Sequence, residues 1–407
     1  MFPSSRSPLL ARPYVLLLCG RTVSMVGNAV APIALAFAVL RVSGSGGALG
    51  LVLAARTVPQ VVFLLFGGVI ADRVPRRGIL VVAAAGAGVT QAVAAGLLLG
   101  GVAQVWQLGV LEAMNGTAAA MLFPATQSVL PQTVPVSALQ RANVVFRLGR
   151  NSTQVLGAAV GGLAVAAFGP GQAIAFDAAT FFLAAALWSG MRLAPVRAGG
   201  APPSMVRDLV EGWHDFWSRT WLWSIVVQFC FVNAATGAAF QVLGPIVAKQ
   251  RLGGAGPWGL IVAANAAGLT LGALVMFWLR ARRPLLAGNT GVLLVLPSLA
   301  LLAYGAPVGW LIAAAVLAGL GMEVFGVNWD LTMQREIPPD RLGRLFSYDA
   351  VGSFVFLPVG QALAGPAMAA FGLSGALLVA GGVVAAATLA IYAVRDVRTL
   401  RVATAAA

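Results

Sequence analysis

Acid–base and metal chemistry have few residues to use in this chain. Its 407 residues include 12 aspartates and glutamates, one histidine (His214) and two cysteines (Cys19 and Cys230). The histidine and cysteines lack metal-ligand spacing, and no Gly-x-x-x-x-Gly-Lys-Ser/Thr sequence is present to hold a nucleotide phosphate. The scattered acids form no nucleophile or cofactor cluster, so we expect neither an enzyme nor a bound metal or cofactor.

Several charged and polar residues instead fall inside long apolar segments. Helical spacing places such residues on one face of the first, fourth and tenth segments, in the pairs Arg21 and Asn28, Glu112 and Asn115, and Glu323 and Asp330. A charge near the centre of a bilayer costs about 2.5–3.5 kcal/mol on insertion scales. Each such residue is therefore expected to have a partner or to line a water-filled cavity.

The depth of each charge within its segment suggests a role. Arg56 lies about eight residues into the second segment and Glu112 about seven into the fourth, so both reach the same depth. A structural ion pair and a proton-coupling role for Glu112 both remain open. Asp177, Asp330 and Asp349 lie near predicted segment ends, where interfacial caps or packing ties are favoured.

The segments themselves are typical of membrane-spanning helices. Hydrophobic residues make up 59% of the chain and charged residues 9%, against about 25% charged residues in soluble domains. Each apolar run is near the roughly 20 residues that cross a hydrocarbon core. We expect an all-α membrane protein with 12 transmembrane helices at 12–40, 48–70, 78–100, 105–127, 144–167, 171–193, 221–247, 257–280, 284–304, 308–328, 344–367 and 371–394.

The cations indicate how these helices are oriented. With alternate loops on alternate sides, 21 of the 26 cations share one side, and only Arg41, Lys249 and Arg251 lie on the other. The positive-inside rule places the larger set, and with it both termini, in the cytoplasm. This distribution explains the net charge of +14 without a nucleic-acid partner, so none is expected.

The two halves of the chain repeat. Residues of the same type recur at shifts of 203 and 209 residues, as in Pro135 and Pro338, Gly157 and Gly360, and Arg73 and Arg282. An even number of spans per half gives a parallel repeat. We therefore expect a six-helix bundle at 1–193, a cytoplasmic linker at 194–220, and a second six-helix bundle at 221–407. The linker stretch Met205–Trp217 is amphipathic and predicts a helix on the inner membrane surface.

The loop after the second span carries a family signature. Gly68-Val-Ile-Ala-Asp72-Arg73-Val-Pro-Arg76-Arg77 resembles the loop motif of the major facilitator superfamily, with its glycine, Asp-Arg and basic pair. The resemblance implies the major facilitator fold and a gating role for this loop. The matching loop of the second half has Ala281 where Asp72 would align, so any gating latch is expected to be asymmetric.

Further motifs resemble the branch of this superfamily that holds enterobactin exporters and macrolide-efflux permeases. They are Pro124-Ala125, Ala142-Asn143 and Ala175-Phe176-Asp177-Ala178. The run from Gly157 through Gly161 and Gly162 is similar to the fifth-helix antiporter signature, with Ala158 replacing its proline. Two departures concern proton coupling: Glu112 replaces the fourth-helix arginine, and Asn28 replaces the first-helix aspartate.

The resemblance also implies which helices line the transport cavity, namely the first and fourth of each half. The candidates for proton coupling or cavity lining are therefore Glu323, Glu112, Arg21, Asn28, Asn115, Arg56 and Asp330. Glu323 is the preferred proton site. The implied function is export of a small amphiphilic or hydrophobic molecule (a drug, siderophore or secondary metabolite) by proton antiport. A monomer in the bacterial plasma membrane is expected; a proton-coupled nutrient importer and a transport-inactive sensor or scaffold remain alternatives.

Overall fold

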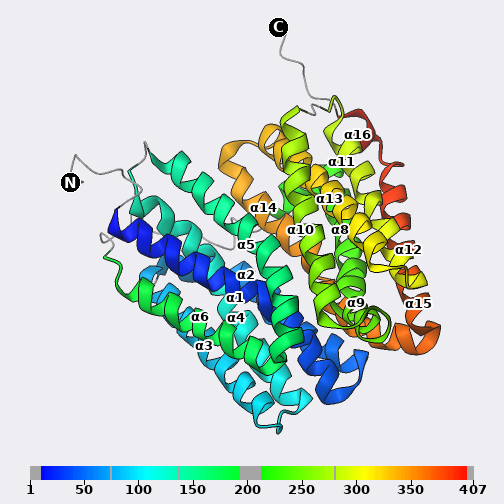
Figure 1. The fold of residues 1–407 in the computed structure, drawn as a ribbon. Coiled ribbons are helices and arrows are strands. Elements are labelled where there is room, and N and C mark those ends of the chain that lie inside the picture. The colour runs from blue at the N-terminus through cyan, green and yellow to red at the C-terminus, as the bar shows by residue number, and fades with distance from the viewer. Residues whose placement is uncertain (1–10, 74–75, 136–137, 193–211, 279–280, 401–407) are drawn as a thin grey trace. The chain divides into compact units, whose positions relative to one another are not determined.

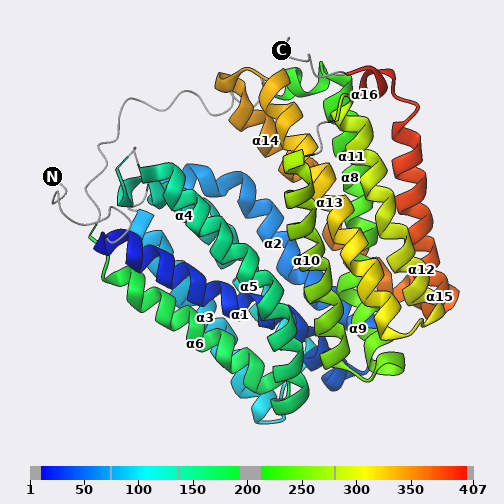
Figure 2. The same ribbon diagram turned by 45° about the horizontal axis from the view of Figure 1, so that its top comes forward.

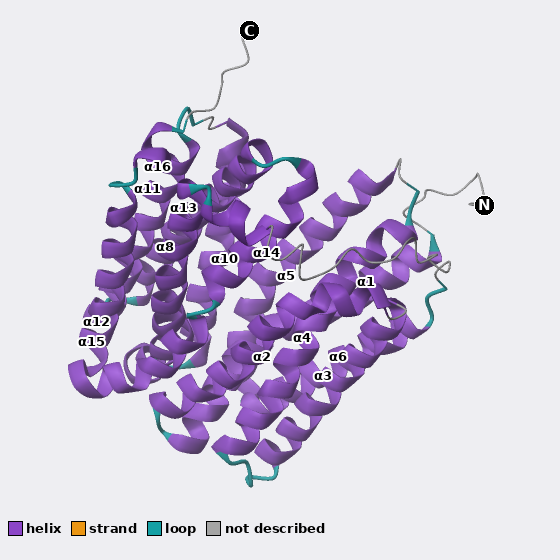
Figure 3. Ribbon diagram, turned by 180° about the vertical axis from the view of Figure 1, so that it is seen from behind, coloured by secondary structure: helices purple, strands orange, loops and turns teal. Residues whose placement is uncertain are grey.

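The structure of the protein is a computed structural model. It describes residues 11–73, 76–135, 138–192, 212–278 and 281–400, and within these ranges every regular element is a helix (Figure 3). Two compact units are present: Met1–Ala198 with Gly254–Gly259, and Gly199–Gly253 with Leu260–Ala407. These are the N-terminal unit and the C-terminal unit, respectively.

The N-terminal unit contains six long helices, which are α1 (Arg12–Ser43), α2 (Gly46–Arg73), α3 (Arg76–Leu99), α4 (Val105–Thr133), α5 (Leu139–Phe168) and α6 (Pro170–Ser189). In Figure 1, α1 packs along both α5 and α6, while α4 packs along α2 and α3. Glycines with positive φ, Gly44 (φ 63°) and Gly169 (φ 89°), end α1 and α5. A residue with a Cβ would be strained there, so these positions set the short connections that turn the chain back.

The helices of the C-terminal unit are α8 (Thr220–Thr236), α9 (Gly244–Val247), α10 (Ala255–Trp278), α11 (Pro284–Val292), α12 (Leu296–Tyr304), α13 (Val308–Glu336), α14 (Pro339–Phe354), α15 (Leu357–Ile391) and α16 (Arg395–Thr399). Figure 2 shows α11 alongside α13, and α8 packs on α14 and α15. Two π-helical stretches, Gly237–Leu243 and Ala248–Leu252, flank α9. Pro245 has no N–H to donate within this run, which interrupts regular α-helical bonding.

The described residues contain nine helical runs long and apolar enough to cross a membrane. These confirm the predicted all-α membrane class. The last run, Arg344–Ile391, has 48 residues, more than twice the roughly 20 needed for one crossing. Its helix α15 breaks at Gly372 (φ 69°, ψ 171°), close to the break predicted between 367 and 371. The full count of twelve helices and the borders of the two bundles stay predictions.

Part of the predicted linker helix lies within the described residues. The segment 212–217 is helical, and its Trp213 and Phe216 rings each lie 5.9 Å from the Tyr348 ring of α14. Asp215 lies 3.5 Å from both Arg219 and Arg341. These contacts attach this end of the linker to the C-terminal unit. The remainder of the expected amphipathic helix, up to 211, lies outside the described residues.

Candidate functional site

The N-terminal unit contains a largely buried ion pair between α2 and α4, in which the Arg56 side chain is 19% exposed. Arg56 Nη1 donates to Glu112 Oε2 at 2.9 Å, and Glu112 is 2% exposed. One turn after Glu112, a Cβ at Gly116 would overlap the carbonyl oxygen of Arg56. The missing side chain lets the two helices approach closely, as small residues do at membrane-helix contacts. The ion pair predicted from matched depths is confirmed.

Side chains of α3 extend this pair into a polar network. Gln91 Nε2 donates to the second oxygen of Glu112 at 3.2 Å, and Asn115 Nδ2 donates to Thr90 Oγ1 at 3.3 Å. All four residues are buried. Both carboxylate oxygens of Glu112 therefore accept a hydrogen bond, and the network joins α2, α3 and α4.

Asp177 of α6 is a second buried acid in the same unit. It is the eighth residue of a helix that begins at Pro170, and it is 0% exposed. Among the described residues, neither carboxylate oxygen of Asp177 has a hydrogen-bond partner. Arg56 and Glu112 are both close enough for their charges to act on it. Asp177 therefore does not cap a helix end, because it lies inside the unit, and the alternative role of a packing tie stays a prediction.

Asp177 is positioned by a close contact with α1. A Cβ at Gly27 would overlap Asp177 Oδ1 and Thr180 Oγ1. The Thr180 hydroxyl donates to the main-chain oxygen of Asp177 at 2.7 Å, so its proton is already used. The sequence signal was present in the Ala175-Phe176-Asp177-Ala178 motif, an acid in an apolar helix. What it did not reveal is which helix face turns inward.

The polar stripe on α1 is satisfied largely within its own helix. Asn28 Nδ2 donates to the main-chain oxygen of Ser24 at 2.8 Å and to its hydroxyl at 3.2 Å. Ser24 is buried, while Arg21 and Asn28 are partly buried. Asn28 therefore has a local structural partner.

The antiporter-like motif forms the crossing of α5 over α1. A Cβ at Gly157 would overlap the Ala29 side chain, and one at Gly161 would lie 2.9 Å from Val30 Cα. Gly162, the next residue, is also buried. The four-residue spacing of Gly157 and Gly161 matches the small-x-x-x-small pattern of tight membrane-helix pairs.

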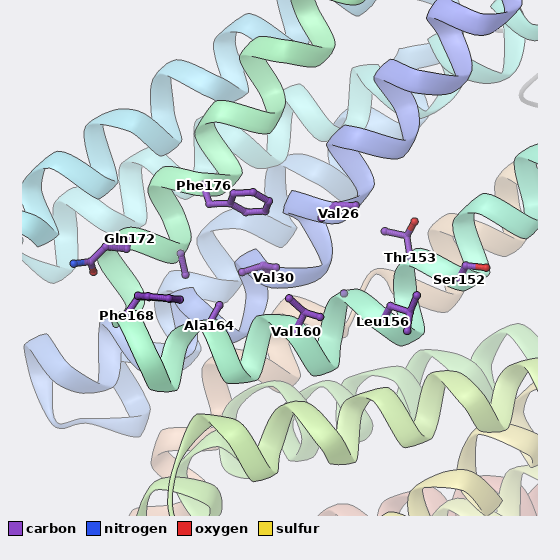
Figure 4. A pocket seen from close by; sticks show the side chains of 12 residues that line it. Val26, Val30, Ser152, Thr153, Leu156, Val160, Ala164, Phe168, Gln172 and Phe176 are labelled. Atoms are coloured by element: carbon purple, nitrogen blue, oxygen red, sulfur yellow. The ribbon is translucent and has the colours of Figure 1, made fainter.

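An apolar groove lies beside this crossing, between α1, α5 and α6. Its volume is about 400 Å³, and Figure 4 shows most of its side chains converging on a common space. The apolar lining comes from Val26, Val30, Leu156, Gly157, Val160, Ala164, Phe168, Ala173 and Phe176. Ser152 and Thr153 lie toward one end and Gln172 toward the other. The groove can therefore hold an apolar body with a polar group at an end.

The predicted acids of the C-terminal unit lie on α13 and α14. Glu323 is partly buried next to α10, where a Cβ at Gly272 would lie 2.8 Å from Glu323 Cβ, and Asp330 is exposed two turns further on. Asp349 accepts hydrogen bonds from Trp329 Nε1 at 3.0 Å and Ser353 Oγ at 3.1 Å. Asp349 thus ties α13 to α14 by packing, which is one of the two roles predicted for it, the other being an interfacial cap.

The predicted gating residues are only partly covered by the structure. Gly68, Asp72 and Arg73 belong to the last turns of α2, but the side chains of 64–76, Arg76 included, lie outside the described part. Arg77, at the start of α3, donates to the carbonyl oxygen of Ser189 at the end of α6. The gating role stays a prediction. Within the described residues, no three His, Cys, Asp or Glu side chains form a group that could hold a metal.

Known proteins similar to this chain are transporters. A family model described as Major Facilitator Superfamily matches residues 17–348. The chain is 25% identical over 381 residues to the uncharacterized MFS-type transporter YfiS of Bacillus subtilis, covering 90% of this chain and 89% of the relative. It is 26% identical over 388 residues to the multidrug efflux pump Tap of Mycobacterium tuberculosis, covering 90% of this chain and 89% of that pump.

Solved structures support the fold. The nucleoside transporter NupG matches with a TM-score of 0.73 at 14% identity, over 95% of this chain and 99% of that one. A bacterial homologue of the human lysosomal transporter Spinster, inward-facing and unoccupied, matches with a TM-score of 0.75 at 16% identity, over 97% of this chain and 99% of the other. At these identities the likeness concerns the fold alone.

Proposed function

Because the chain belongs to the Major Facilitator Superfamily and is a multi-pass membrane transporter, we propose that it exports small amphiphilic or hydrophobic molecules in exchange for protons. The membrane would be the bacterial plasma membrane, with both termini in the cytoplasm. The observation that carries the proposal is the apolar groove between α1, α5 and α6. The likeness to the multidrug efflux pump Tap supports the same direction of transport.

The lining of the groove favours an apolar substrate. Burying apolar surface contributes about 25 cal/mol per Å², and this needs no particular placement of donors and acceptors. A polar nutrient would require several convergent polar groups, whereas the groove offers only Ser152, Thr153 and Gln172, spread between its ends. This lining therefore supports recognition of varied amphiphiles over recognition of one polar nutrient.

Proton coupling requires an acid that meets water from each side of the membrane in turn. We propose Glu323 as such an acid in the C-terminal unit, because it is partly buried in the apolar helix α13. Glu112 is the less suitable residue, since Arg56 and Gln91 already occupy both of its oxygens. The loop containing Asp72 would govern the switch between the two access states.

Everted membrane vesicles test export directly. Ethidium and a bisbenzimide dye serve as probes, and respiration supplies an inward-acid pH gradient that nigericin collapses. We expect dye accumulation that stops with nigericin. In the groove, Val160→Asn should reduce accumulation, whereas Val82→Asn, on α3 and 72% exposed, should not. Dye accumulation that nigericin does not change would contradict antiport. Equal dye accumulation by the two variants would contradict the groove as the substrate site.

Cysteine labelling tests the proposed orientation. After replacing Cys19 and Cys230, single cysteines are placed at Ser218 and Gln250, both exposed. A membrane-impermeant maleimide added to intact cells should label Gln250→Cys and leave Ser218→Cys unlabelled. The opposite pattern would reverse the topology and, with it, the direction of transport inferred here.

A further inference from the structure

Among the described side chains of the N-terminal unit, two buried acids, Glu112 and Asp177, lie near one partly buried cation, Arg56. Arg56 is hydrogen-bonded to Glu112, and Asp177 lies close enough to feel both charges. An ionised carboxylate in an apolar interior costs a great deal of free energy unless it is paired and hydrogen-bonded. Asp177 has no hydrogen bond to either oxygen among the described residues. Taking up a proton is the simplest way for this acid to lose its charge.

Other charges facing Asp177 do not supply a second counterion. Of the elements packed on α6, α3 has no charged residue from Gly78 to Leu99, and α5 carries its arginines only before Ser152. On α1, Arg21 lies six residues before Gly27, the residue that Asp177 touches. Arg56 of α2 and Glu112 of α4 complete the set. Among the described side chains, the charges acting on and including Asp177 are therefore one cation and two acids.

The position of Asp177 also connects it with the groove. Val26, which precedes Gly27, lines the groove, as do Ala173 and Phe176 of α6. Asp177 therefore lies directly behind the wall formed by α1 and α6. A substrate that pushes these two helices apart would change the surroundings of the carboxylate, and a change in its charge would change how tightly they pack.

We propose that Asp177 is a proton-binding site of the N-terminal unit, coupled to occupancy of the groove between α1, α5 and α6. One carboxylate oxygen takes a proton from water on the outer side and releases it to water on the inner side, with no other bond made or broken. Protonation removes the excess negative charge beside the Arg56–Glu112 pair. Asp349 of the C-terminal unit, which accepts two side-chain hydrogen bonds, serves as the comparison acid. This inference rests on the proposed proton antiport.

Infrared spectroscopy reports the proton without any transport. Purified protein in nanodiscs, labelled with aspartate carrying ¹³C in its carboxyl group, is compared at neutral and alkaline pH, because exposed aspartates, with a pKa of about 3.9, are already ionised at neutral pH. We expect a protonated-carboxyl C=O band that is isotope-shifted in the wild type, absent in Asp177→Asn and retained in Asp349→Asn. If the wild type shows no such band, or if the band survives Asp177→Asn, the proposal is overturned. The wild-type measurement holds even if the variant folds poorly.

Transport then tests the coupling. In proteoliposomes, Asp177→Asn should lose gradient-driven ethidium transport while retaining ethidium exchange, Asp177→Glu should recover part of the driven flux, and Asp396→Asn should match the wild type. Full driven transport in Asp177→Asn would overturn the coupling role. A wild type without driven transport would instead overturn the proposed antiport, while the infrared band would still report a proton on Asp177.

Discussion

The two units build the same helix crossing with different chemistry. In the N-terminal unit α4 meets α2 at Gly116, where a Cβ would overlap the carbonyl oxygen of Arg56. In the C-terminal unit α13 meets α10 at Gly319, where a Cβ would overlap the carbonyl oxygen of Asn265. The repeat shifts of 203 and 209 residues align these pairs with one another. Both units therefore repeat the same contact, in which a glycine of one helix lies against a main-chain carbonyl of the other.

The charges at this crossing are not repeated. Arg56 donates to the Glu112 carboxylate, whereas Asn265, aligned with Arg56, donates to the main-chain oxygen of Ala315, aligned with Glu112, at 3.2 Å. Asp177 aligns with Ala380. The C-terminal unit shows that this crossing packs without a charged group. The charges of the N-terminal unit are thus unnecessary for packing, which favours a functional reason for keeping them in the membrane.

The first prediction, which concerns the largest loss of transport, is that the C-terminal unit carries a proton as well. Glu323→Gln should reduce gradient-driven ethidium transport about tenfold or more, equivalent to about 1.4 kcal/mol or more in a rate barrier, yet retain ethidium exchange. The Asp177 infrared band should persist in this variant. Glu336→Gln, at the end of the same helix, is the control. Full driven transport in Glu323→Gln would confine coupling to the N-terminal unit.

The second prediction removes the charged crossing. Breaking a buried ion pair from one side typically costs about 3–5 kcal/mol, because the other charge is left alone. Arg56→Asn and Glu112→Ala should each lower the thermal stability of the detergent-solubilised protein more than the double variant, which installs the C-terminal chemistry. Since the Arg56 side chain is 19% exposed, its effect should fall toward the lower end of that range.

Stability and transport should separate in the double variant. It should fold close to normally but show altered pH dependence of driven transport, because Asp177 would then lack both neighbouring charges. Stability losses that add strictly from the two single variants would mean that the pair is not energetically coupled. The Arg56–Glu112 contact would then not account for any difference in stability between the crossings of the two units.

The third prediction tests the shared packing. Gly116→Ala and Gly319→Ala should each destabilise the protein by about 1–3 kcal/mol, as overpacking does, and by similar amounts in the two units. Gly109→Ala on α4 and Gly326→Ala on α13, where a Cβ meets open space, are matched controls that should be nearly neutral. Thermal unfolding of purified variants measures all four. Tolerance of Gly116→Ala alone would show that the charged crossing is held less tightly.

Part of this comparison could be predicted from the sequence. Composition and apolar runs were enough for the all-α membrane fold. The residue count into each run gave the Arg56–Glu112 pair as one of two open roles for Glu112, because opposite charges at equal depth meet only if their helices are adjacent. The break near Gly372 also followed from the length of the last apolar run. These features depend on distance along a helix, which the sequence records directly.

The position of Asp177 could not be predicted in the same way. Its burial depends on the rotation of α6 about its own axis, and that rotation is set by contacts with Gly27 of α1 about 150 residues earlier. A nearly uniformly apolar helix gives no amphipathic face to indicate the direction. The hydrogen bond that uses the Thr180 proton on the backbone is equally invisible in the sequence. Tertiary packing therefore decides which acid is left without a donor.

The smallest expected effect concerns the loops after α2 and α10, where Asp72 in one half aligns with Ala281 in the other. If the first loop acts as a latch, Asp72→Asn should slow turnover by about three- to tenfold, at most about 1.4 kcal/mol. Substrate affinity should stay nearly constant, because the loop follows the end of α2, whereas the groove lies between α1, α5 and α6. Dye binding by fluorescence and dye flux in proteoliposomes measure the two quantities separately.

The reverse substitution sharpens this asymmetry. Ala281→Asp places an acid among Arg282 and Arg283, where it can form new ion pairs and hold the second loop as the first is held. The symmetric latch created by Ala281→Asp should overstabilise one access state and so slow turnover. Ala281→Asn, which adds no charge, should leave turnover unchanged. Weaker dye binding with unchanged turnover in Asp72→Asn would mean that Asp72 acts on the substrate site. The difference between the two loops would then have nothing to do with switching.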